Sequence, residues 1–332
     1  MIGEQCWWAG LPELIAQLSG CTPGRAREML SAGGVRVEGM CATGSALNSD
    51  GTPVEIAVSV SWEGRRVRVV MDPAHWEVDP VRRSRRAREA CERLADSLPP
   101  ALRHHLLGGV RMAWPDDAAL AGWLPWGCLW VGAEPGRPGI AAYLSARWGP
   151  PAERWPRVFD WVQRQGIMPA EPLAAAARYG EPASVSLAAG RELKVRVYYR
   201  LCRPLRLADL GLPALDETAM AGFLAAVIGE RPIRCAGLLL SVSAVAGAGA
   251  FGGCKVDVCA HCVSRSPVEW AVLIERLAAE FGLPPPGLVP VLLGGQAEMA
   301  FIGLGFPEAG ARQLNCYLKA PVRRRFLAAS HV

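Results

Sequence analysis

The feature that most constrains the fold of this chain is a strand–turn–strand pattern that occurs five times after residue 52. Each copy has two runs that are typical of β-strands, and a turn rich in Gly or Pro joins them. The paired runs are 53–62 with 65–71, 127–133 with 139–148, 183–189 with 192–201, 235–245 with 254–263, and 299–306 with 312–320. Helical stretches fill the intervals, at 82–98, 152–164, 170–179, 215–228 and 268–281.

Five hairpins amount to about ten antiparallel strands. An open sheet of that size leaves unpaired edges, and closure into a barrel removes them. We therefore predict an α+β fold: an antiparallel ten-stranded β-barrel built from five helix–hairpin (ααββ) repeats, with the helices on the outside. The barrel domain is expected at 51–322. Residues 1–50 are expected to form a helical segment packed on it, with short helices at 11–18 and 23–31, and residues 323–332 a C-terminal tail.

Strand periodicity predicts what lines this barrel. Residues alternate between the two faces of a strand, and in four of the runs one face is polar and the other apolar. The polar faces include Lys194, Arg196, Tyr198 and Arg200 in one strand, and Lys255, Asp257, Cys259 and His261 in another. If helices cover the apolar faces, the polar faces line the interior. The alternative is an ordinary sheet with its polar face in bulk water, and the five hairpins with intervening helices favour the polar lumen.

The side chains expected in the lumen carry an excess of positive charge. They comprise the cations Arg66, Arg68, Lys194, Arg196, Lys255 and Lys319, the acids Glu55 and Asp257, and the aromatic residues Tyr143, Tyr198 and Tyr317. Enclosed cations need an anion, and two acids cannot neutralise six bases. The pattern therefore predicts a polyanionic ligand, and a diphosphate suits the geometry of Arg and Lys. For Arg68 and Lys319, a solvated strand end is the competing interpretation.

Tyrosines between these cations add a second property, because ring faces stabilise a positive centre by ~0.5–2 kcal/mol each. A diphosphate site beside such rings fits the ionisation of an allylic diphosphate; core packing is the alternative for Tyr198 and Tyr317. The chain has no DDxxD-like sequence for magnesium, since Asp116-Asp117 lacks the third acid and is expected in a loop. We therefore expect no metal and no cofactor, with fixed Lys and Arg holding the diphosphate.

Four segments in this order resemble the aromatic prenyltransferases of the ABBA or PT-barrel fold, in particular the indole prenyltransferases similar to dimethylallyltryptophan synthase. They are 51–59 (GTPVEIAVS), Arg66, 194–198 (KVRVY) and 314–319 (LNCYLK). The resemblance implies that Glu55 binds the indole N–H and that Arg66, Lys194 and Arg196 bind the diphosphate. Lys255 is expected to join them from its predicted position in the lumen. The resemblance also implies that Tyr143, Tyr198 and Tyr317 shield the allylic cation from water.

Two positions depart from the family pattern. Ala141 stands where the family usually has a lysine, so one diphosphate contact is missing or comes from elsewhere, for example from Arg147. Asp257 stands where a tyrosine is frequent, and it could bind an acceptor amine or pair with Lys255. The base that restores aromaticity is not identified, and Asp257 and His261 are the candidates.

The remaining sequence features concern the cellular compartment and the classes of partner. Eleven cysteines, an odd number, and a start without a secretory signal indicate reduced thiols in the cytoplasm. A net charge of +5 is too small to indicate a dedicated nucleic-acid binder, and the most apolar stretch, 235–251, is too short for a membrane span of ~20 residues. Residues 22–39 also resemble a small S4-type RNA-binding motif, although a coincidental helix–turn–strand explains them better.

The sequence thus predicts a prenyltransferase that moves an allylic group from dimethylallyl or geranyl diphosphate to an indole-containing acceptor by metal-independent Friedel–Crafts alkylation. Three alternatives stay open. They are transfer to a phenolic acceptor, a non-catalytic barrel that binds an isoprenoid diphosphate, and an RNA-binding protein based on the S4-like segment. We expect a monomer or a homodimer without nucleic-acid or membrane partners.

Overall fold

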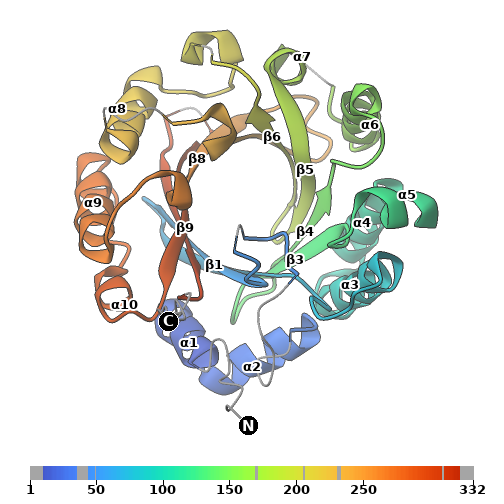
Figure 1. Cartoon of the computed structure of the whole chain (residues 1–332), viewed down its shortest axis with the longest axis horizontal. Helices are drawn as coiled ribbons and strands as arrows, with labels where there is room; N and C mark the ends of the chain where they lie inside the picture. Colours follow the sequence, from blue (N-terminus) through green and yellow to red (C-terminus); the bar gives the residue numbers. More distant parts are fainter. Residues whose placement is uncertain are drawn as a thin grey trace, which may run out of the picture.

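The computed structural model describes residues 10–35, 44–48, 50–168, 171–204, 206–229, 233–308 and 310–321. Its centre is a closed antiparallel barrel of ten strands, in which each strand pairs with its neighbours in the chain and β1 pairs with β10 (Figure 1). The strands are β1 (Val54–Ser61), β2 (Gly64–Met71), β3 (Leu129–Ala133), β4 (Ile140–Ser145), β5 (Gly180–Ala189), β6 (Leu193–Leu201), β7 (Leu238–Val245), β8 (Gly253–Cys259), β9 (Glu298–Phe306) and β10 (Gln313–Lys319). The predicted architecture is confirmed.

The helices form a ring around the barrel (Figure 1). They are α1 (Leu11–Ser19), α2 (Pro23–Ala32), α3 (Pro80–Ala95), α4 (Pro100–Met112), α5 (Asp117–Trp123), α6 (Pro151–Arg164), α7 (Glu171–Tyr179), α8 (Glu217–Ile228), α9 (Pro267–Glu280) and α10 (Val289–Leu293), with three short 3-10 helices, η1 (Leu207–Leu210), η2 (Cys235–Gly237) and η3 (Ala260–Cys262). No helix within the described ranges is long and apolar enough to cross a membrane.

Helix α4 was not predicted from the sequence, and Gly108-Gly109 in its last turns explains why, because glycine disfavours a helix. The structure shows what Gly109 is for. A Cβ there would come within 2.2 Å of Leu187 Cδ1 on β5, and the Gly109 carbonyl accepts a hydrogen bond from Trp161 Nε1 at 3.0 Å. The glycine therefore lets α4 approach the sheet closely.

Two strands are shorter than predicted, because β7 begins late and β8 ends early. The runs 235–245 and 254–263 were expected to be extended throughout, but Cys235–Gly237 and Ala260–Cys262 are 3-10 turns. The alternation of faces therefore stops at Cys259, which matters below for His261.

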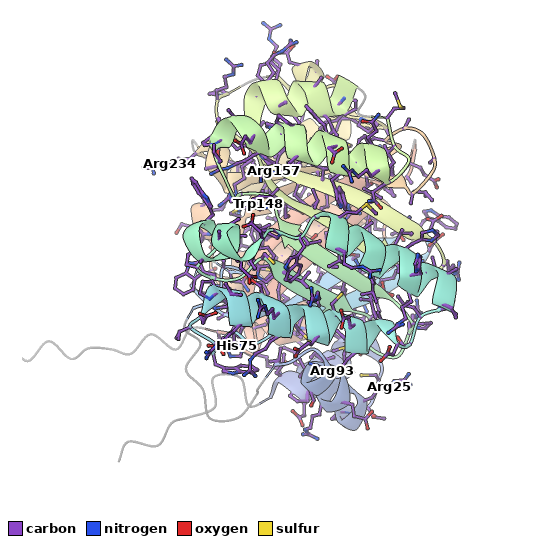
Figure 2. All side chains as sticks on the ribbon, turned by 90° about the vertical axis from the view of Figure 1, so that its right-hand side faces the viewer. Arg25, His75, Arg93, Trp148, Arg157 and Arg234 are labelled. Carbon is purple, nitrogen blue, oxygen red and sulfur yellow. The ribbon has the colours of Figure 1, made fainter. Side chains whose placement is uncertain are left out.

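Arginine side chains also fasten the helical layer. On α6, Arg157 lies over the ring of Trp148, with 3.6 Å between the guanidinium carbon and the ring centroid (Figure 2). Its Nη1 donates to the Trp148 carbonyl at 2.8 Å. The contact joins α6 to the chain that follows β4.

Near the N-terminus, α1 and α2 pack on the outside of β2 and α3. The helical half of the S4-like segment is present as α2, and most of its basic strand lies outside the described residues. Ser45 connects this region to the barrel, because its hydroxyl donates to Asp72 Oδ2 at 2.7 Å.

Asp72 is the centre of a buried network at the end of β2. It is 1% exposed and accepts from Arg83 Nη2 of α3 at 2.6 Å. Burial raises the pKa of Asp72 to about 6, although Arg83, Ser45 and Trp130 lower it by donating hydrogen bonds. The ion pair therefore exists at neutral pH and links three parts of the chain.

We expect Arg83→Ala to destabilise the fold by about 3–5 kcal/mol, because it leaves the Asp72 carboxylate buried without its counter-ion. Urea unfolding measures the loss. Arg85→Ala on the same helix is the matched control, since its pair with Asp117 is more than half exposed and such pairs contribute about 0–1 kcal/mol. Equal losses in the two variants would contradict the assignment.

Candidate active site

The barrel encloses a cavity of about 1120 Å³, which is large enough for two small ligands together. Its two ends differ in construction. At one, the hairpin end, the five short turns join the strand pairs; at the other, the helix end, the chain leaves the strands for the outer helices. Polar side chains line the cavity from both ends to the middle, as the alternation of the strands predicted.

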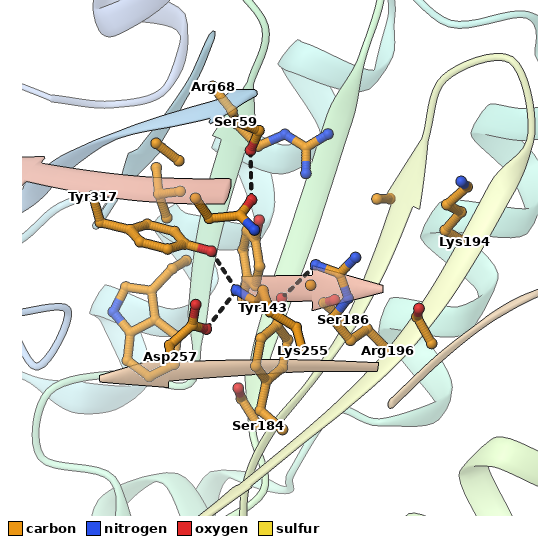
Figure 3. Close-up of a pocket in the computed structure, with 18 of the residues that line it drawn as sticks. Ser59, Arg68, Tyr143, Ser184, Ser186, Lys194, Arg196, Lys255, Asp257 and Tyr317 are labelled. Atoms are coloured by element: carbon orange, nitrogen blue, oxygen red, sulfur yellow. Dashed lines mark hydrogen bonds and ion pairs between the residues drawn. The ribbon is translucent and has the colours of Figure 1, made fainter. Parts of the chain in front are cut away.

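The middle of the cavity holds Arg196 and Lys255 between tyrosine rings (Figure 3). Arg196 Nη1 lies 3.3 Å from the Tyr198 hydroxyl, and no carboxylate pairs with Arg196 in the part of the chain that the structure describes. Lys255 Nζ lies 4.7 Å from the centroid of the Tyr317 ring and 5.8 Å from that of Tyr198. The rings of Tyr198 and Tyr317 therefore already lie near one cation, the Lys255 ammonium.

Tyr143 completes this aromatic wall, and its ring centroid lies 6.2 Å from that of Tyr198. Next to it, Arg68 also lines the cavity and pairs with Glu134 at 2.7 Å. Of the two interpretations of Arg68, the lumen position agrees with the structure and the solvated strand end does not. Burial lowers the pKa of Arg68, but Tyr143 and Glu134 raise it more, so the guanidinium stays charged. Gly132 leaves room for it, because a Cβ there would meet Arg68 Cδ at 3.0 Å.

Two of the predicted diphosphate ligands lie further out. Arg66 and Lys194 line the cavity near the hairpin end, and their side chains are 52% and 50% exposed. Each pairs with an acid of its own turn, Arg66 with Glu63 at 3.3 Å and Lys194 with Glu192 at 3.1 Å. The structure thus divides the predicted cations into a buried set and a rim set.

Arg147 cannot replace the missing lysine contact beside Ala141, because the two lie at different ends. Arg147 follows the end of β4 and is at the helix end, exposed, near Arg200. On β4, Ala141 lies two residues before Tyr143 and is therefore nearer the hairpin end.

Glu55 lies near the helix end of the lumen and is 6% exposed. No described group donates a hydrogen bond to its carboxyl group, which faces the cavity. Burial raises the pKa of Glu55 to about 8, with Lys255 lowering it and Asp257 raising it. The group can therefore change charge near neutral pH.

Lys255 and Asp257 form a buried ion pair with 2.5 Å between Nζ and Oδ2. The same ammonium donates to the Tyr317 hydroxyl, so Lys255 bridges Asp257 and Tyr317 (Figure 3). Burial raises the pKa of Asp257 and lowers that of Lys255, and their mutual attraction opposes both shifts. This pair combines the two predicted residues of β8 into one unit.

Two predicted lumen positions, those of Lys319 and His261, are wrong. Lys319 does not line the cavity; its ammonium pairs with Asp50 and, at 3.8 Å, with Glu298. His261 is exposed on η3 and outside the cavity, because the strand ends at Cys259.

The expected loop at Asp116-Asp117 is the start of α5. Asp116 is its N-cap, and Asp117 pairs with Arg85. Both acids belong to the outer layer. Among the described residues, no group of three or more His, Cys, Asp or Glu side chains is arranged to hold a metal ion.

Trp130 lines the cavity, and no role was predicted for it. Trp130 is on β3, directly opposite Tyr143 of β4. Its side chain hydrogen-bonds to Asp72, which fixes the indole. The alternation of Leu129, Trp130 and Val131 along the predicted strand could have placed Trp130 on the lumen face. Asn315 and Ser59 form a further polar pair at 2.7 Å on adjacent strands of the lumen.

Comparison with solved structures places this arrangement among known folds. The 5-dimethylallyltryptophan synthase from Streptomyces coelicolor is similar, with a TM-score of 0.76, 18% identity, and 94% of this chain and 95% of that chain covered. The 6-dimethylallyltryptophan synthase from Micromonospora olivasterospora, solved with DMASPP and Trp, has a TM-score of 0.76 at 16% identity, covering 94% and 95%. Prenyltransferase PriB, solved with L-tryptophan and dimethylallyl thiolodiphosphate, has a TM-score of 0.73 at 17% identity, covering 94% of each chain.

This chain has the prenyltransferase-barrel fold. The resemblance that the sequence motifs indicated is thereby confirmed for the fold over nearly the whole chain. No family model and no curated protein matches the sequence.

The raised pKa of Glu55 has a consequence for stability. Between about pH 4.5 and 8 the unfolded chain loses the Glu55 proton while the folded chain keeps it, so wild-type stability falls as the pH rises through this window. We expect Glu55→Gln to remove this contribution, which is on the order of a few kcal/mol.

Urea unfolding of the wild type and of Glu55→Gln, at pH 5 and at pH 8.5, tests this expectation. The free energy of unfolding of Glu55→Gln relative to wild type is expected to increase with pH. A difference that is independent of pH would show that Glu55 ionises normally in the folded protein.

Proposed function

We propose that this chain transfers an allylic prenyl group from dimethylallyl or geranyl diphosphate to an indole-containing acceptor. The observation that carries the proposal is the charge balance of the lumen. Asp257 pairs with Lys255 and Glu134 with Arg68, while Arg196 has no carboxylate partner among the described residues. Its guanidinium faces an enclosed cavity bounded by tyrosine rings, and an anionic ligand supplies the missing charge.

In the proposed reaction, Arg196 and Lys255 bind the diphosphate inside the barrel, and Arg66 and Lys194 bind it at the rim. Arg68 joins this set because it lines the same wall. Their fixed positive charge stabilises the negative charge that develops on the leaving group as the carbon–oxygen bond breaks. We propose that these side chains act in place of a metal ion, so no cofactor is required.

The allylic cation then lies among Tyr143, Tyr198 and Tyr317. The rings of Tyr198 and Tyr317 already lie near the ammonium of Lys255, and the three rings would together stabilise a carbocation and exclude water. The acceptor lies toward the helix end, where a carboxyl oxygen of Glu55 accepts the indole N–H hydrogen bond. This bond orients the ring and increases its electron density for attack.

The solved structures support the choice of substrates. Three proteins with this fold were solved with tryptophan together with DMASPP or dimethylallyl thiolodiphosphate. The nine cysteines in the described ranges are free thiols, which supports a cytoplasmic setting for the proposed enzyme. Oligomeric state, monomer or homodimer, remains a prediction.

Incubation with dimethylallyl or geranyl diphosphate in EDTA tests the proposal. The acceptor panel contains tryptophan, indole peptides and phenols, and mass spectrometry detects the products. We expect prenylated indole products and no loss of rate with the chelator. Transfer to phenols alone would replace the acceptor class, and binding of the diphosphate without transfer to any acceptor would leave a non-catalytic barrel.

Two variants separate the donor and acceptor ends of the cavity. Glu55→Gln is expected to reduce prenylation by about 100-fold while diphosphate binding survives, because it weakens only the bond to the indole N–H. Arg196→Met is expected to weaken binding of the donor by about tenfold or more, since a charge-assisted hydrogen bond contributes about 1.5–3 kcal/mol.

Steady-state kinetics and titration with dimethylallyl thiolodiphosphate measure both effects. Arg276→Met is the matched control, because Arg276 lies on the outer face of α9, where its side chain is 54% exposed. If Arg196→Met binds the donor analogue as tightly as Arg276→Met does, Arg196 does not hold the diphosphate.

A further inference from the structure

One carboxylate oxygen of Asp257 has a partner, and the other has none in the described part of the chain. Oδ2 receives the Lys255 ammonium at 2.5 Å, while Oδ1 is buried and has no hydrogen-bond partner in the described part of the chain. The residue is 2% exposed and lines the cavity. Leaving a buried carboxylate oxygen without a partner destabilises the fold, so its presence here indicates that the oxygen has a use.

The neighbouring strand is shaped around this oxygen. Gly303 of β9 lies directly opposite Asp257, and a Cβ at Gly303 would come within 1.9 Å of Oδ1. The other side of the carboxylate is fixed by Lys255, which Tyr317 holds in turn. Oδ1 is therefore held in one position by its surroundings and remains free of protein donors.

We infer that Asp257 is the base that takes the ring proton from the alkylated acceptor and restores its aromaticity. This inference rests on the proposed function. After the new carbon–carbon bond forms, the attacked ring carbon carries both the prenyl group and a hydrogen. The C–H bond breaks, its electron pair returns to the ring, and the proton binds Asp257 Oδ1. The carbon–oxygen bond to the diphosphate broke in the earlier ionisation step, so proton loss needs no oxidant or other reactant.

Other lumen groups are less suited to this step. The Lys255 ammonium has no lone pair while it is paired, and burial holds the pKa of the Tyr317 hydroxyl well above its usual value, so it stays protonated. Glu55 is assigned to the indole nitrogen. Glu134 is paired with Arg68. Glu55 and Asp257 are the described lumen acids with an oxygen that no protein group donates to, and Asp257 Oδ1 is the one that has no other role in the proposed reaction.

The lysine makes the aspartate a suitable base. Burial raises the pKa of Asp257, which makes its carboxylate a stronger base than an exposed one, while the Lys255 charge favours the ionised form. When Asp257 becomes neutral, Lys255 loses its counter-ion and can bind the departing diphosphate more strongly. The proton then leaves with the diphosphate or with water.

Asp257→Asn tests the inference, because it keeps the shape and removes the basic oxygen. The assays use tryptophan and indole-3-propionate, each with ordinary and ring-deuterated indole. We expect kcat to fall about 100-fold or more for both acceptors, in the range of general base catalysis. A primary deuterium isotope effect on kcat should appear, because proton loss becomes rate-limiting. Prenyl alcohol should increase relative to prenylated product as the cation is lost to water.

A second variant keeps the carboxylate and moves it. Gly303→Ala forces Oδ1 from its position, and we expect it to reduce kcat less than Asp257→Asn does, again with an isotope effect. Gly222→Ala on α8 is the matched control, since its Cβ meets nothing within 4 Å. Tight binding of dimethylallyl thiolodiphosphate shows that each variant is folded, and if Asp257→Asn does not fold, Gly303→Ala decides.

Three results would overturn the inference. One is an unchanged kcat without an isotope effect in Asp257→Asn, or in Gly303→Ala where that variant decides. Another is a loss confined to tryptophan, because indole-3-propionate lacks the amine and the aspartate would then bind the ammonium group of the acceptor. The third is a loss that appears wholly in donor binding. Failure of the wild-type protein to prenylate any acceptor is a different outcome, which contradicts the proposed function itself.

Discussion

Closure of β1 onto β10 is the constraint on which the rest of the structure depends. In a closed barrel every strand must turn one face inward, so residues that would be ordinary surface groups on an open sheet become enclosed. The outer faces of the same strands are apolar and buried under the helices; Val195, Val197 and Tyr199 of β6 are fully buried there. One geometric fact thus determines both the hydrophobic core and the charged interior.

Enclosure changes what the polar side chains can do. Glu55 and Asp257 both have raised pKa values because they are buried, and Lys255 has a lowered one for the same reason. On an exposed sheet these groups would titrate normally and be screened by water. Inside the barrel these three groups lie along the axis, with Lys255 nearer the hairpin end and Asp257 and Glu55 nearer the helix end. This order matches a reaction in which an anion leaves on one side and a nucleophile attacks from the other.

The sequence predicted the barrel and most of its lining because both follow from local patterns. Alternation along β6 placed Arg196 and Tyr198 in the lumen, and the same alternation along β8 placed Lys255 and Asp257 there. It was wrong for His261, since nothing in the sequence showed that the strand would end at Cys259. It could not show the partners either. The contacts of Lys319 with Asp50, Arg68 with Glu134 and Trp130 with Asp72 join residues far apart in the chain, and only the folded arrangement brings them together.

The rim and the interior differ in one respect that affects how a ligand arrives. Arg66 and Lys194 at the hairpin end are each neutralised by a carboxylate of the same turn, whereas the unpaired charge of Arg196 lies deep inside. Each of these two pairs adds little long-range attraction for an anion, and the attraction of Arg196 develops after entry, where low dielectric makes it strong. Arg137 and Arg191 of the hairpin turns also line the mouth, and no described carboxylate pairs with them. Entry is therefore assisted by exposed cations whose attraction salt screens, whereas the choice among phosphates is made inside, where a slender apolar tail fits among the tyrosines.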